Sequence, residues 1–445
     1  MQHSDIIIIG GGPGGYKAAE YAAKHGRTVT LFEQEELGGT CLNSGCIPTK
    51  TFCRHAAVMR DLQHAETFGI KDLTFDFSFP LVQQRKQSVV AQLRQGIDTL
   101  LTAQGVTVVR ASASFVAPHT VMADGEEYSA QHIIIATGSQ AKRLEIEGAE
   151  LDGVMTSTEM LNIDYVPKRL CIVGAGVVGM EMASCFAAFG SDVTVIEYAR
   201  ECLPMLDSDL AKRLRKAMPA EFHMQSAVSG ISRADDGSLI VAFEKKGKPQ
   251  AVAVDAVLLA TGRMPNTDGL NLDAVGVAYG RNGIQTDSDM RTTVPHIYAI
   301  GDCNGRCMLA HAATMQGIHV VNKLLGIDDN ISFDIMPSAV FTMPEAGCVG
   351  LSEDQCRERG ISYICRKAYY RANGKALAMN ETEGMLKIMA DSQTERIIGC
   401  HVYGAHAADI VQEVSALMCK QTTLEQLHDM VHIHPTLSEI LHEIR

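Results

Sequence analysis

The chain has 445 residues, more than one compact core usually supports, so its length predicts several domains. Its 46% hydrophobic and 20% charged residues are typical of a globular protein rather than a disordered or membrane-embedded one. The formal net charge of −13 argues against nucleic acid and anionic membrane surfaces as partners, because neither attracts an acidic protein.

The first residues lack the features of a targeting segment, because neither a basic stretch nor a small-residue cleavage site precedes the first apolar run. Gly, Pro or charged residues interrupt every apolar stretch before it reaches the roughly 18 to 20 residues of a membrane span. We therefore expect a cytoplasmic protein. In that reducing compartment the 13 cysteines should be mostly thiols, and any disulfide is expected to be catalytic rather than structural.

The N-terminal stretch predicts a buried strand, a glycine loop and a helix in direct succession. Residues 6–9 are all isoleucine, and an alanine-rich run ending at Ala23 follows the loop. A second predicted strand, 28–32, is followed by an acidic residue. The glycines of the loop are Gly10, Gly12 and Gly15, and the acid is Glu33.

The same pattern recurs later in the chain, with every marker displaced by the same number of positions. Residues 170–173 predict the strand, the helix should extend to Phe189, and residues 193–196 predict the next strand. The glycines of this copy are Gly174, Gly176 and Gly179, and its acid is Glu197.

Each copy has the context that a dinucleotide-binding loop requires. The glycines permit a tight turn and close approach of the backbone, so that a pyrophosphate can lie on the helix N-terminus, and the acid can accept hydrogen bonds from an adenosine ribose. Glycine loops also cap helices for purely structural reasons, but the strand, helix and acid around both copies favour binding. The repeat therefore predicts two dinucleotides.

Both copies end in a strand and an Ala-Thr-Gly turn. The first turn contains Thr137 and Gly138, and the second contains Thr261 and Gly262. The first copy is longer than the second between its acid and its turn. It therefore contains an insertion, which begins directly after Glu33.

The insertion contains two cysteines, Cys41 and Cys46, in the run GGTCLNSGCIPTK. Because they follow the first dinucleotide strand, we expect them beside the molecule that this domain binds, where they could transfer electrons. Residues from Ile47 onward predict a helix, so Cys46 should lie at a helix N-terminus, where the dipole favours a thiolate, and Lys50 adds a positive charge. The alternatives are two unlinked thiols or half of a zinc site, but no second Cys or His pair stands at ligand spacing.

This run resembles the signature of the flavin-dependent pyridine-nucleotide disulfide reductases, a family that includes dihydrolipoamide dehydrogenase, glutathione reductase and mercuric reductase. The resemblance extends over essentially the whole chain. Residues 297–300, followed by Gly301 and Asp302, are similar to the family's second FAD motif, whose acid binds the ribityl chain. The resemblance implies that the first glycine domain binds FAD and that the second binds the nicotinamide cofactor.

The resemblance also implies roles for the residues of the insertion. By this mapping Cys46 faces the flavin and Cys41 exchanges with the substrate. Lys50 would lie near the reactive edge of the flavin and would pair with an acid that matches Glu181.

The C-terminal run HIHPTLSE resembles the dihydrolipoamide dehydrogenase version of the family. The resemblance implies that His434 is the acid-base and that Glu439 orients it, since a carboxylate on one imidazole nitrogen fixes the tautomer. For His432 a packing role in a loop is the favoured interpretation. Mercuric reductase is disfavoured because its C-terminal vicinal cysteine pair is missing. The last cysteines here are Cys400 and Cys419.

NAD is expected rather than NADP, because Glu197 stands where a free ribose 2′-hydroxyl would be bound. Arg200 could accommodate a 2′-phosphate, but a solvated loop charge is the favoured interpretation. Cys303 and Cys307 suggest a second redox or metal site, yet no partner ligands are evident, so no metal site is predicted. The remaining cysteines, including Cys171 and Cys185, are expected to be core residues.

These features predict an α/β protein with two Rossmann-like, three-layer dinucleotide-binding domains and an α+β C-terminal dimerisation domain. The expected domains are an FAD-binding domain with the redox disulfide at 1–145, an NAD-binding domain at 146–264, a central segment completing the FAD site at 265–333, and an interface domain at 334–445.

The resemblance implies oxidation of protein-bound dihydrolipoamide to lipoamide through the Cys41–Cys46 disulfide and FAD, with hydride transfer to NAD. The alternatives are an NAD(P)H-dependent reductase of another small disulfide, as in glutathione reductase, and a non-catalytic flavoprotein subunit. The expected partners are a second copy of the chain and a lipoyl-bearing protein of a 2-oxoacid dehydrogenase or glycine cleavage complex. The direction of flux is implied by the family only.

Overall fold

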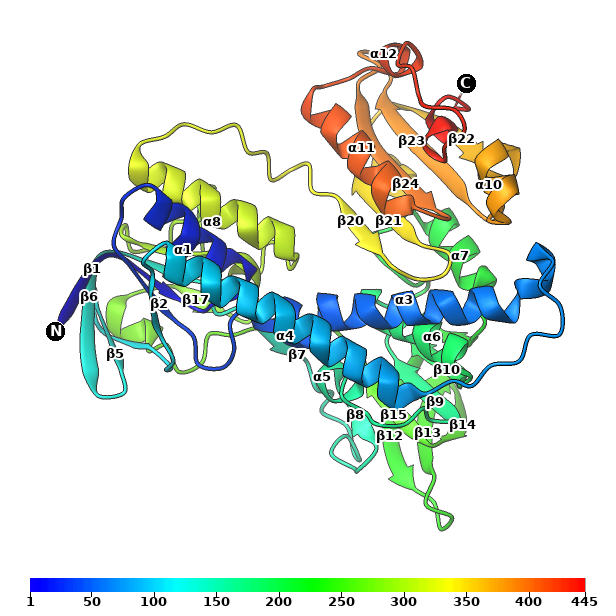
Figure 1. Cartoon of the computed structure of the whole chain (residues 1–445), viewed down its shortest axis with the longest axis horizontal. Helices are drawn as coiled ribbons and strands as arrows, with labels where there is room; N and C mark the ends of the chain where they lie inside the picture. The colour runs from blue at the N-terminus through cyan, green and yellow to red at the C-terminus, as the bar shows by residue number, and fades with distance from the viewer. Residues whose placement is uncertain (445) are drawn as a thin grey trace. The chain divides into compact units, whose positions relative to one another are not determined.

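A computed structural model describes residues 1–444 and divides into two compact units (Figure 1). The first unit consists of Met1–Thr51, Pro80–Lys142 and Gly262–Ile331, and the second consists of Phe52–Phe79, Arg143–Thr261 and the chain from Ser332 onward. Among the described residues, no helix is both long enough and apolar enough to cross a membrane.

The first unit is built on a seven-stranded sheet in the order β3-β2-β1-β6-β5-β4, with β19 also paired to β6. The pairs β1–β2, β1–β6, β2–β3 and β6–β19 are parallel, and the remaining two are antiparallel. The strands are β1 (Gln2–Ile9), β2 (Val29–Phe32), β3 (Thr107–Val109), β4 (Ser114–Ala117), β5 (Thr120–Ala123), β6 (Glu126–Ile135) and β19 (Ile297–Ala299).

The continuous isoleucine run of β1 is explained by its central place in this sheet. Ile7 and Ile8 point to opposite faces and are both completely buried, which is typical of a parallel strand covered on both sides. Helices α1 (Pro13–Lys24) and α8 (Ala310–Leu325) pack side by side in this unit (Figure 1).

Shorter elements complete the first unit. They are α2 (Gly39–Ser44), the strand pair β7 (Ser139–Ala141) and β16 (Arg263–Pro265), the pair β17 (Tyr279–Gly280) and β18 (Gly283–Ile284), and the 3₁₀ turns η2 (Leu272–Val275) and η3 (Gly301–Asn304). Two helices, α3 (Cys46–Gln63) and α4 (Phe79–Ala103), each have residues in both units, and the turn η1 (Ala65–Phe68) lies between them in sequence.

The second unit contains a parallel five-stranded sheet in the order β11-β10-β9-β15-β8 and an antiparallel sheet β12-β13-β14. The elements are β8 (Val154–Met155), α5 (Ser157–Met160), β9 (Arg169–Val173), α6 (Val177–Phe189), β10 (Asp192–Glu197), α7 (Ser208–Ala217), β11 (Glu221–Met224), β12 (Ser226–Arg233), β13 (Leu239–Lys245), β14 (Lys248–Val254) and β15 (Ala256–Leu259). The apolar helix α6 follows β9, as α1 follows β1.

The C-terminal part of the second unit is an antiparallel sheet in the order β20-β21-β24-β23-β22, with α11 packed against β20, β21 and β24 (Figure 1). Its elements are β20 (Ser338–Val340), β21 (Ala346–Gly350), α9 (Glu353–Glu358), β22 (Tyr363–Tyr369), η4 (Tyr370–Ala372), α10 (Gly374–Met379), β23 (Met385–Asp391), β24 (Ile397–Tyr403), α11 (Ala407–Cys419), α12 (Leu424–His428) and η5 (Ser438–Leu441).

The predicted fold class is therefore confirmed: a mixed sheet with a parallel core and an all-parallel sheet each carry a strand, glycine loop and helix, and an α+β segment follows. The boundaries match the sequence pattern closely, since β1 ends at Ile9 and β10 ends at Glu197. The four-domain division at 1–145, 146–264, 265–333 and 334–445 stands as a proposal.

Candidate functional site

The first residue of each glycine motif must be glycine because the backbone leaves no room for a side chain. Gly10 has φ +109°, and a Cβ atom there would lie 2.3 Å from the carbonyl oxygen of Ala136. Gly174 has φ +107°, and its Cβ would lie 2.4 Å from the carbonyl oxygen of Ala260. Both contacts join the loop to the end of the strand before the Ala-Thr-Gly turn. The repeat in sequence is thus a repeat in structure.

The second glycine of each motif is the N-cap of a helix that has no side-chain cap. Gly12 precedes α1 and Gly176 precedes α6. A Cβ atom at Gly176 would meet nothing within 4 Å, and at Gly12 it would meet only the Cα of Gly39 at 3.9 Å. The space beside both N-cap residues is therefore open, and the N-terminus of a helix with such space beside it can bind a pyrophosphate. These residues fit the two dinucleotides that the sequence predicts.

The acid of each motif is held by two backbone amides. The Glu33 carboxylate accepts from Gly11 N at 2.8 Å and from Glu35 N at 2.9 Å. Glu197 repeats this arrangement with Ala175 N at 2.5 Å and Ala199 N at 2.6 Å. Each carboxylate oxygen has a second lone pair that can accept from a ribose hydroxyl. Arg200, three residues beyond Glu197, has an exposed side chain.

Asp302 belongs to a cluster that sequence analysis did not identify. Its carboxylate accepts from Ser139 Oγ at 2.5 Å, and the Arg263 guanidinium donates to Ser139 Oγ at 2.7 Å and to the Ser139 carbonyl at 2.6 Å. Burial lowers the pKa of Arg263, while Asp302 and Cys46 act in the opposite direction. A signal was present, because Ser139 and Arg263 directly follow the glycines of the two Ala-Thr-Gly turns.

The two turns are also linked through Thr137. Its hydroxyl donates to the carbonyl of Asn266 at 2.7 Å, and the Asn266 amide donates to the Thr137 carbonyl at 3.0 Å. Gly138 follows with φ +72°, and Gly262 has φ +109°. The pairing of β7 with β16 continues this connection. The segment after residue 262 is thereby attached to the first glycine domain.

The two cysteines of the insertion lie in consecutive helices. Cys41 is in α2, and α3 begins at Cys46, as the sequence predicts. The hydrogen bond between the two thiols raises the pKa of Cys41, burial raises it further, and Lys50 opposes both effects. Both side chains are partly exposed, so another thiol can reach them for exchange.

Lys50 and Glu181 belong to different units of the structure. Lys50 is one helical turn after Cys46, which puts the two side chains on the same face of α3. Glu181 is only 3% exposed in α6, and its Oε1 atom accepts from Phe341 N at 2.9 Å. The pairing of Lys50 with Glu181 stays a prediction.

His434 and Glu439 form a hydrogen-bonded pair near the C-terminus. His434 Nδ1 lies 2.9 Å from Glu439 Oε1, and Glu439 Oε2 accepts from Thr436 N at 2.8 Å. The Thr436 amide, and then His434, lower the pKa of Glu439, so it is a carboxylate near neutral pH. A carboxylate can only accept, so Nδ1 carries the proton and Nε2 is left as a base.

His432 has more polar contacts than the packing role favoured by the sequence would require. Its Nε2 atom lies 2.8 Å from Glu413 Oε1, and its Nδ1 atom lies 2.8 Å from His442 Nε2. Its side chain is only 7% exposed, whereas Val431 and Ile433 on either side are 98% and 80% exposed. His432 thus attaches the segment that carries His434 to α11.

Cys303 and Cys307 do not form a pair of the kind seen at Cys41 and Cys46. Cys303 is completely buried, its thiol donates to the carbonyls of Ile300 and Ile135, and burial raises its pKa to about 11. Burial also raises the pKa of Cys307. Neither has the character of a reactive thiolate.

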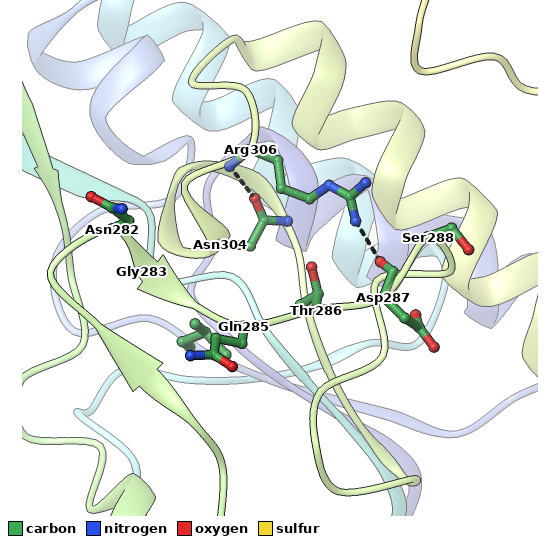
Figure 2. Close-up of a pocket in the computed structure, with 9 residues that line it drawn as sticks. Asn282, Gly283, Gln285, Thr286, Asp287, Ser288, Asn304 and Arg306 are labelled. Carbon is green, nitrogen blue, oxygen red and sulfur yellow. Dashed lines mark hydrogen bonds between the residues drawn. The ribbon is translucent and has the colours of Figure 1, made fainter.

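A cavity of about 400 Å³ lies elsewhere in the first unit, along β18 and the residues that flank it. Figure 2 shows Arg306 between two partners: its amide donates to Asn304 Oδ1 at 3.0 Å, and its guanidinium donates to the Asp287 carbonyl. The lining residues run from Asn282 to Ser288 and include Asn304 and Arg306. None of them is a predicted cofactor or catalytic residue, so this cavity is separate from the candidate site.

The sequence matches two families along most of its length. Residues 4–317 match the family described as pyridine nucleotide-disulphide oxidoreductase, and residues 336–445 match its dimerisation domain. This family uses FAD and NAD(H), which confirms the two predicted cofactors. The dimerisation domain implies a homodimer.

Similar proteins and a solved structure support the same family. The chain is 37% identical to a dihydrolipoyl dehydrogenase of Chlamydia muridarum, covering 98% of this chain and 95% of the relative, and 37% identical to one of Bacillus subtilis, covering 98% and 97%. It is 35% identical to a leghemoglobin reductase of Glycine max, covering 99% and 86%. The structure of the HOCl-induced flavoprotein disulfide reductase RclA from Escherichia coli is 31% identical and superposes with a TM-score of 0.89 over 99% of both chains. On this evidence, the chain belongs to the pyridine nucleotide-disulphide oxidoreductase family and is an oxidoreductase.

Proposed function

We propose that this protein is a dihydrolipoamide dehydrogenase, which oxidises protein-bound dihydrolipoamide to lipoamide and passes the electrons to NAD. The observation that carries the proposal is the hydrogen-bonded pair of His434 and Glu439, which provides a base for a thiol proton in a protein whose disulfide-forming cysteines are also present. Full-length relatives with this activity support it.

The glycine motifs would hold the two cofactors. The loop with Gly10, Gly12 and Gly15 would hold the FAD pyrophosphate, with Glu33 on the ribose and Asp302 on the ribityl chain. The loop of Gly174, Gly176 and Gly179 would hold NAD, with Glu197 on its ribose. When bound, these groups supply the two-electron chemistry that connects a thiol pair to a nicotinamide.

The protein's own residues then carry out thiol exchange. His434 Nε2 takes the proton of one substrate thiol, and the resulting thiolate attacks Cys41 Sγ. The Cys41–Cys46 bond breaks, and Cys46 leaves as a thiolate at the N-terminus of α3, where the helix dipole and Lys50 stabilise the charge. The second substrate thiol then attacks the substrate sulfur of the mixed disulfide, its proton passes to the departing Cys41 sulfur, and Cys41 is released as a thiol. The substrate loses two electrons and becomes a cyclic disulfide, while the enzyme pair gains them.

The partner for this reaction would be a lipoyl group carried on another protein, such as a 2-oxoacid dehydrogenase or glycine cleavage complex. The His434 side chain is 80% exposed in the single chain, as expected for a residue that completes its site only in a dimer. We propose that His434 serves the Cys41–Cys46 pair of the neighbouring subunit.

A turnover assay with free dihydrolipoamide and NAD tests the proposal. We expect turnover with dihydrolipoamide and NAD, and much slower reduction of oxidised glutathione by NADH or NADPH. The likeness to RclA favours a second candidate, a reductase of another disulfide. A faster rate with a different small disulfide than with lipoamide would establish that candidate instead. Absence of both activities in FAD-loaded protein would point to a non-catalytic flavoprotein subunit.

A further inference from the structure

A second pair of cysteines lies in contact, within the second unit and apart from the Cys41–Cys46 pair. The sulfur of Cys53, in α3, is 3.6 Å from the sulfur of Cys185, in α6. This distance is a contact between thiols, because a disulfide bond is about 2.05 Å long. The two positions are 132 residues apart in the chain, so only the tertiary structure brings them together.

The contact is held in place by the residues on either side of it. Phe52, next to Cys53, packs against Phe186, next to Cys185, with ring centroids 6.4 Å apart. Phe52 also packs against Phe189 at 6.0 Å. Three turns further along α3, the Gln63 amide donates to the carbonyl of Ala188 at 3.4 Å. The helices α3 and α6 therefore pack against each other along this stretch, which holds the two sulfurs near each other.

The two thiols differ in exposure in the way that a peroxide-sensitive pair requires. Cys185 is completely buried, whereas Cys53 is partly exposed and can be reached from solvent. An oxidant from solvent would therefore react with Cys53 first, and the thiol nearest to the oxidised Cys53 sulfur would be that of Cys185. Unlike Cys53, Cys171 is completely buried, and burial raises its pKa to about 12.

We propose that Cys53 and Cys185 form a second oxidisable dithiol, which a peroxide converts into a disulfide between α3 and α6. The Cys53 sulfur attacks one oxygen of hydrogen peroxide, which breaks the O–O bond and gives a sulfenic acid and one water. The Cys185 sulfur then attacks the sulfenic sulfur, forms the S–S bond and releases a second water. The two sulfurs lose two electrons and two protons in total, and the peroxide takes them up.

The disulfide would connect two helices whose first residues belong to the candidate site. α3 begins with Cys46, and α6 begins at the second glycine loop. The loop that it closes is long, so it should raise the temperature at which the protein unfolds. The site needs neither substrate nor turnover, and the proposal is therefore independent of the proposed function.

Peptide mapping of the FAD-loaded protein after treatment with hydrogen peroxide tests the proposal. Trypsin separates residues 51–54, which contain Cys53, from the peptide with Cys46, and it releases residues 170–200 with both Cys171 and Cys185. We expect a cross-linked species of these two peptides, lighter than their sum by two hydrogens and cleaved by dithiothreitol. It should be absent in Cys53→Ala and in Cys185→Ala, and present in the matched control Cys171→Ala.

Thermal unfolding provides a second measurement on the same samples. Peroxide should raise the melting temperature of the unmodified protein and of Cys171→Ala by a few degrees, but not that of Cys53→Ala. If Cys53 is found as a sulfinic acid without a cross-link, or if both thiols are still reduced while other cysteines are oxidised, the proposal is wrong. A cross-link that persists in Cys185→Ala would assign the partner to Cys171 and would also overturn it.

Discussion

His434 Nδ1 lies 2.9 Å from Glu439 Oε1, yet the His434 ring is 80% exposed in the single chain. The carboxylate determines which nitrogen carries the proton, and the exposure leaves the other nitrogen open to a substrate. A base that is oriented but uncovered is consistent with a site completed by a second subunit. The first two predictions test these two properties separately.

Replacing Glu439 with Gln should lower kcat/KM for dihydrolipoamide by about 10- to 100-fold, because the imidazole loses the acceptor that holds its tautomer. The flavin spectrum should not change. Glu443→Gln is the matched control, since Glu443 is an exposed acid four residues further along and lies outside the pair. Steady-state kinetics of the two variants would decide, and equal activity in both would remove Glu439 from the mechanism.

Mixed dimers test whether the site is shared between subunits. Cys41→Ser and His434→Gln homodimers should each be nearly inactive in dithiol oxidation. Heterodimers refolded from both should recover activity, because one of their two sites receives intact Cys41 and intact His434 from different chains. The other site carries both lesions. Mixed dimers with no recovered activity would show that His434 serves its own chain or is not the base.

The two cysteines of the redox pair should differ in their optical signatures. Cys41→Ser should keep a bound flavin with a long-wavelength thiolate-to-flavin charge-transfer band, because Cys46 remains as a thiolate at the start of α3. Cys46→Ser should show no such band. Both should lose dithiol oxidation. Absorption spectra of the purified variants distinguish them, and the opposite pattern would reverse the two assigned roles.

Cofactor preference should depend on Glu197. Its carboxylate is held between the amides of Ala175 and Ala199, where it would repel a 2′-phosphate. The unmodified enzyme should strongly prefer NAD over NADP, and Glu197→Gln should narrow the ratio of kcat/KM values by about tenfold while keeping an acceptor for one amide. Arg200→Gln is the control and should change little. Equal kcat/KM values for NAD and NADP in the unmodified enzyme would indicate that Arg200 binds the 2′-phosphate.

Stability should fall in mildly acidic solution because of His401. This histidine on β24 is 1% exposed, its Nδ1 atom accepts from Asp207 N at 3.0 Å, and burial lowers its pKa to about 4. The unfolded chain has the ordinary pKa of 6.5, so it binds a proton more tightly than the folded protein does. His401 therefore contributes about 3 kcal/mol above pH 6.5 that is lost as the pH falls from 6.5 toward 4.

Melting temperatures between pH 7 and pH 4.5 check this prediction. His401→Asn keeps a side-chain acceptor but does not titrate, so its melting temperature should be lower at pH 7 and should fall less steeply with acid. A neighbouring ion cluster places Lys387 Nζ 2.7 Å from Asp207 and 2.9 Å from Glu353. Lys387 lowers the pKa of Glu353, so Glu353 stays ionised between pH 7 and pH 4.5 and serves as a reference that does not titrate with His401. Parallel pH profiles for the variant and the unmodified protein would contradict the assignment.

The amino-acid sequence by itself determined the local features of this protein. Gly10 and Gly174 each follow a buried strand and precede a helix, and the backbone conformation that they require excludes a side chain. Cys46 stands at the start of a helix because a helical run with Pro48 in its first turn follows it. Such features depend on residues close together in the chain, so periodicity and residue type predict them directly.

Only the tertiary structure decided which distant residues meet. Ser139 and Arg263 surround Asp302, His432 attaches its loop through Glu413, and Cys53 lies against Cys185. These contacts arise where separate strands and helices pack together. The repeat marks Ser139 and Arg263 as equivalent positions, but it does not show that they meet at Asp302. The role favoured for His432, packing in a loop, underestimated its hydrogen bonds, because Glu413 comes from α11 and His442 follows η5. Side-chain chemistry at long sequence separation is set by packing, which a single sequence does not display.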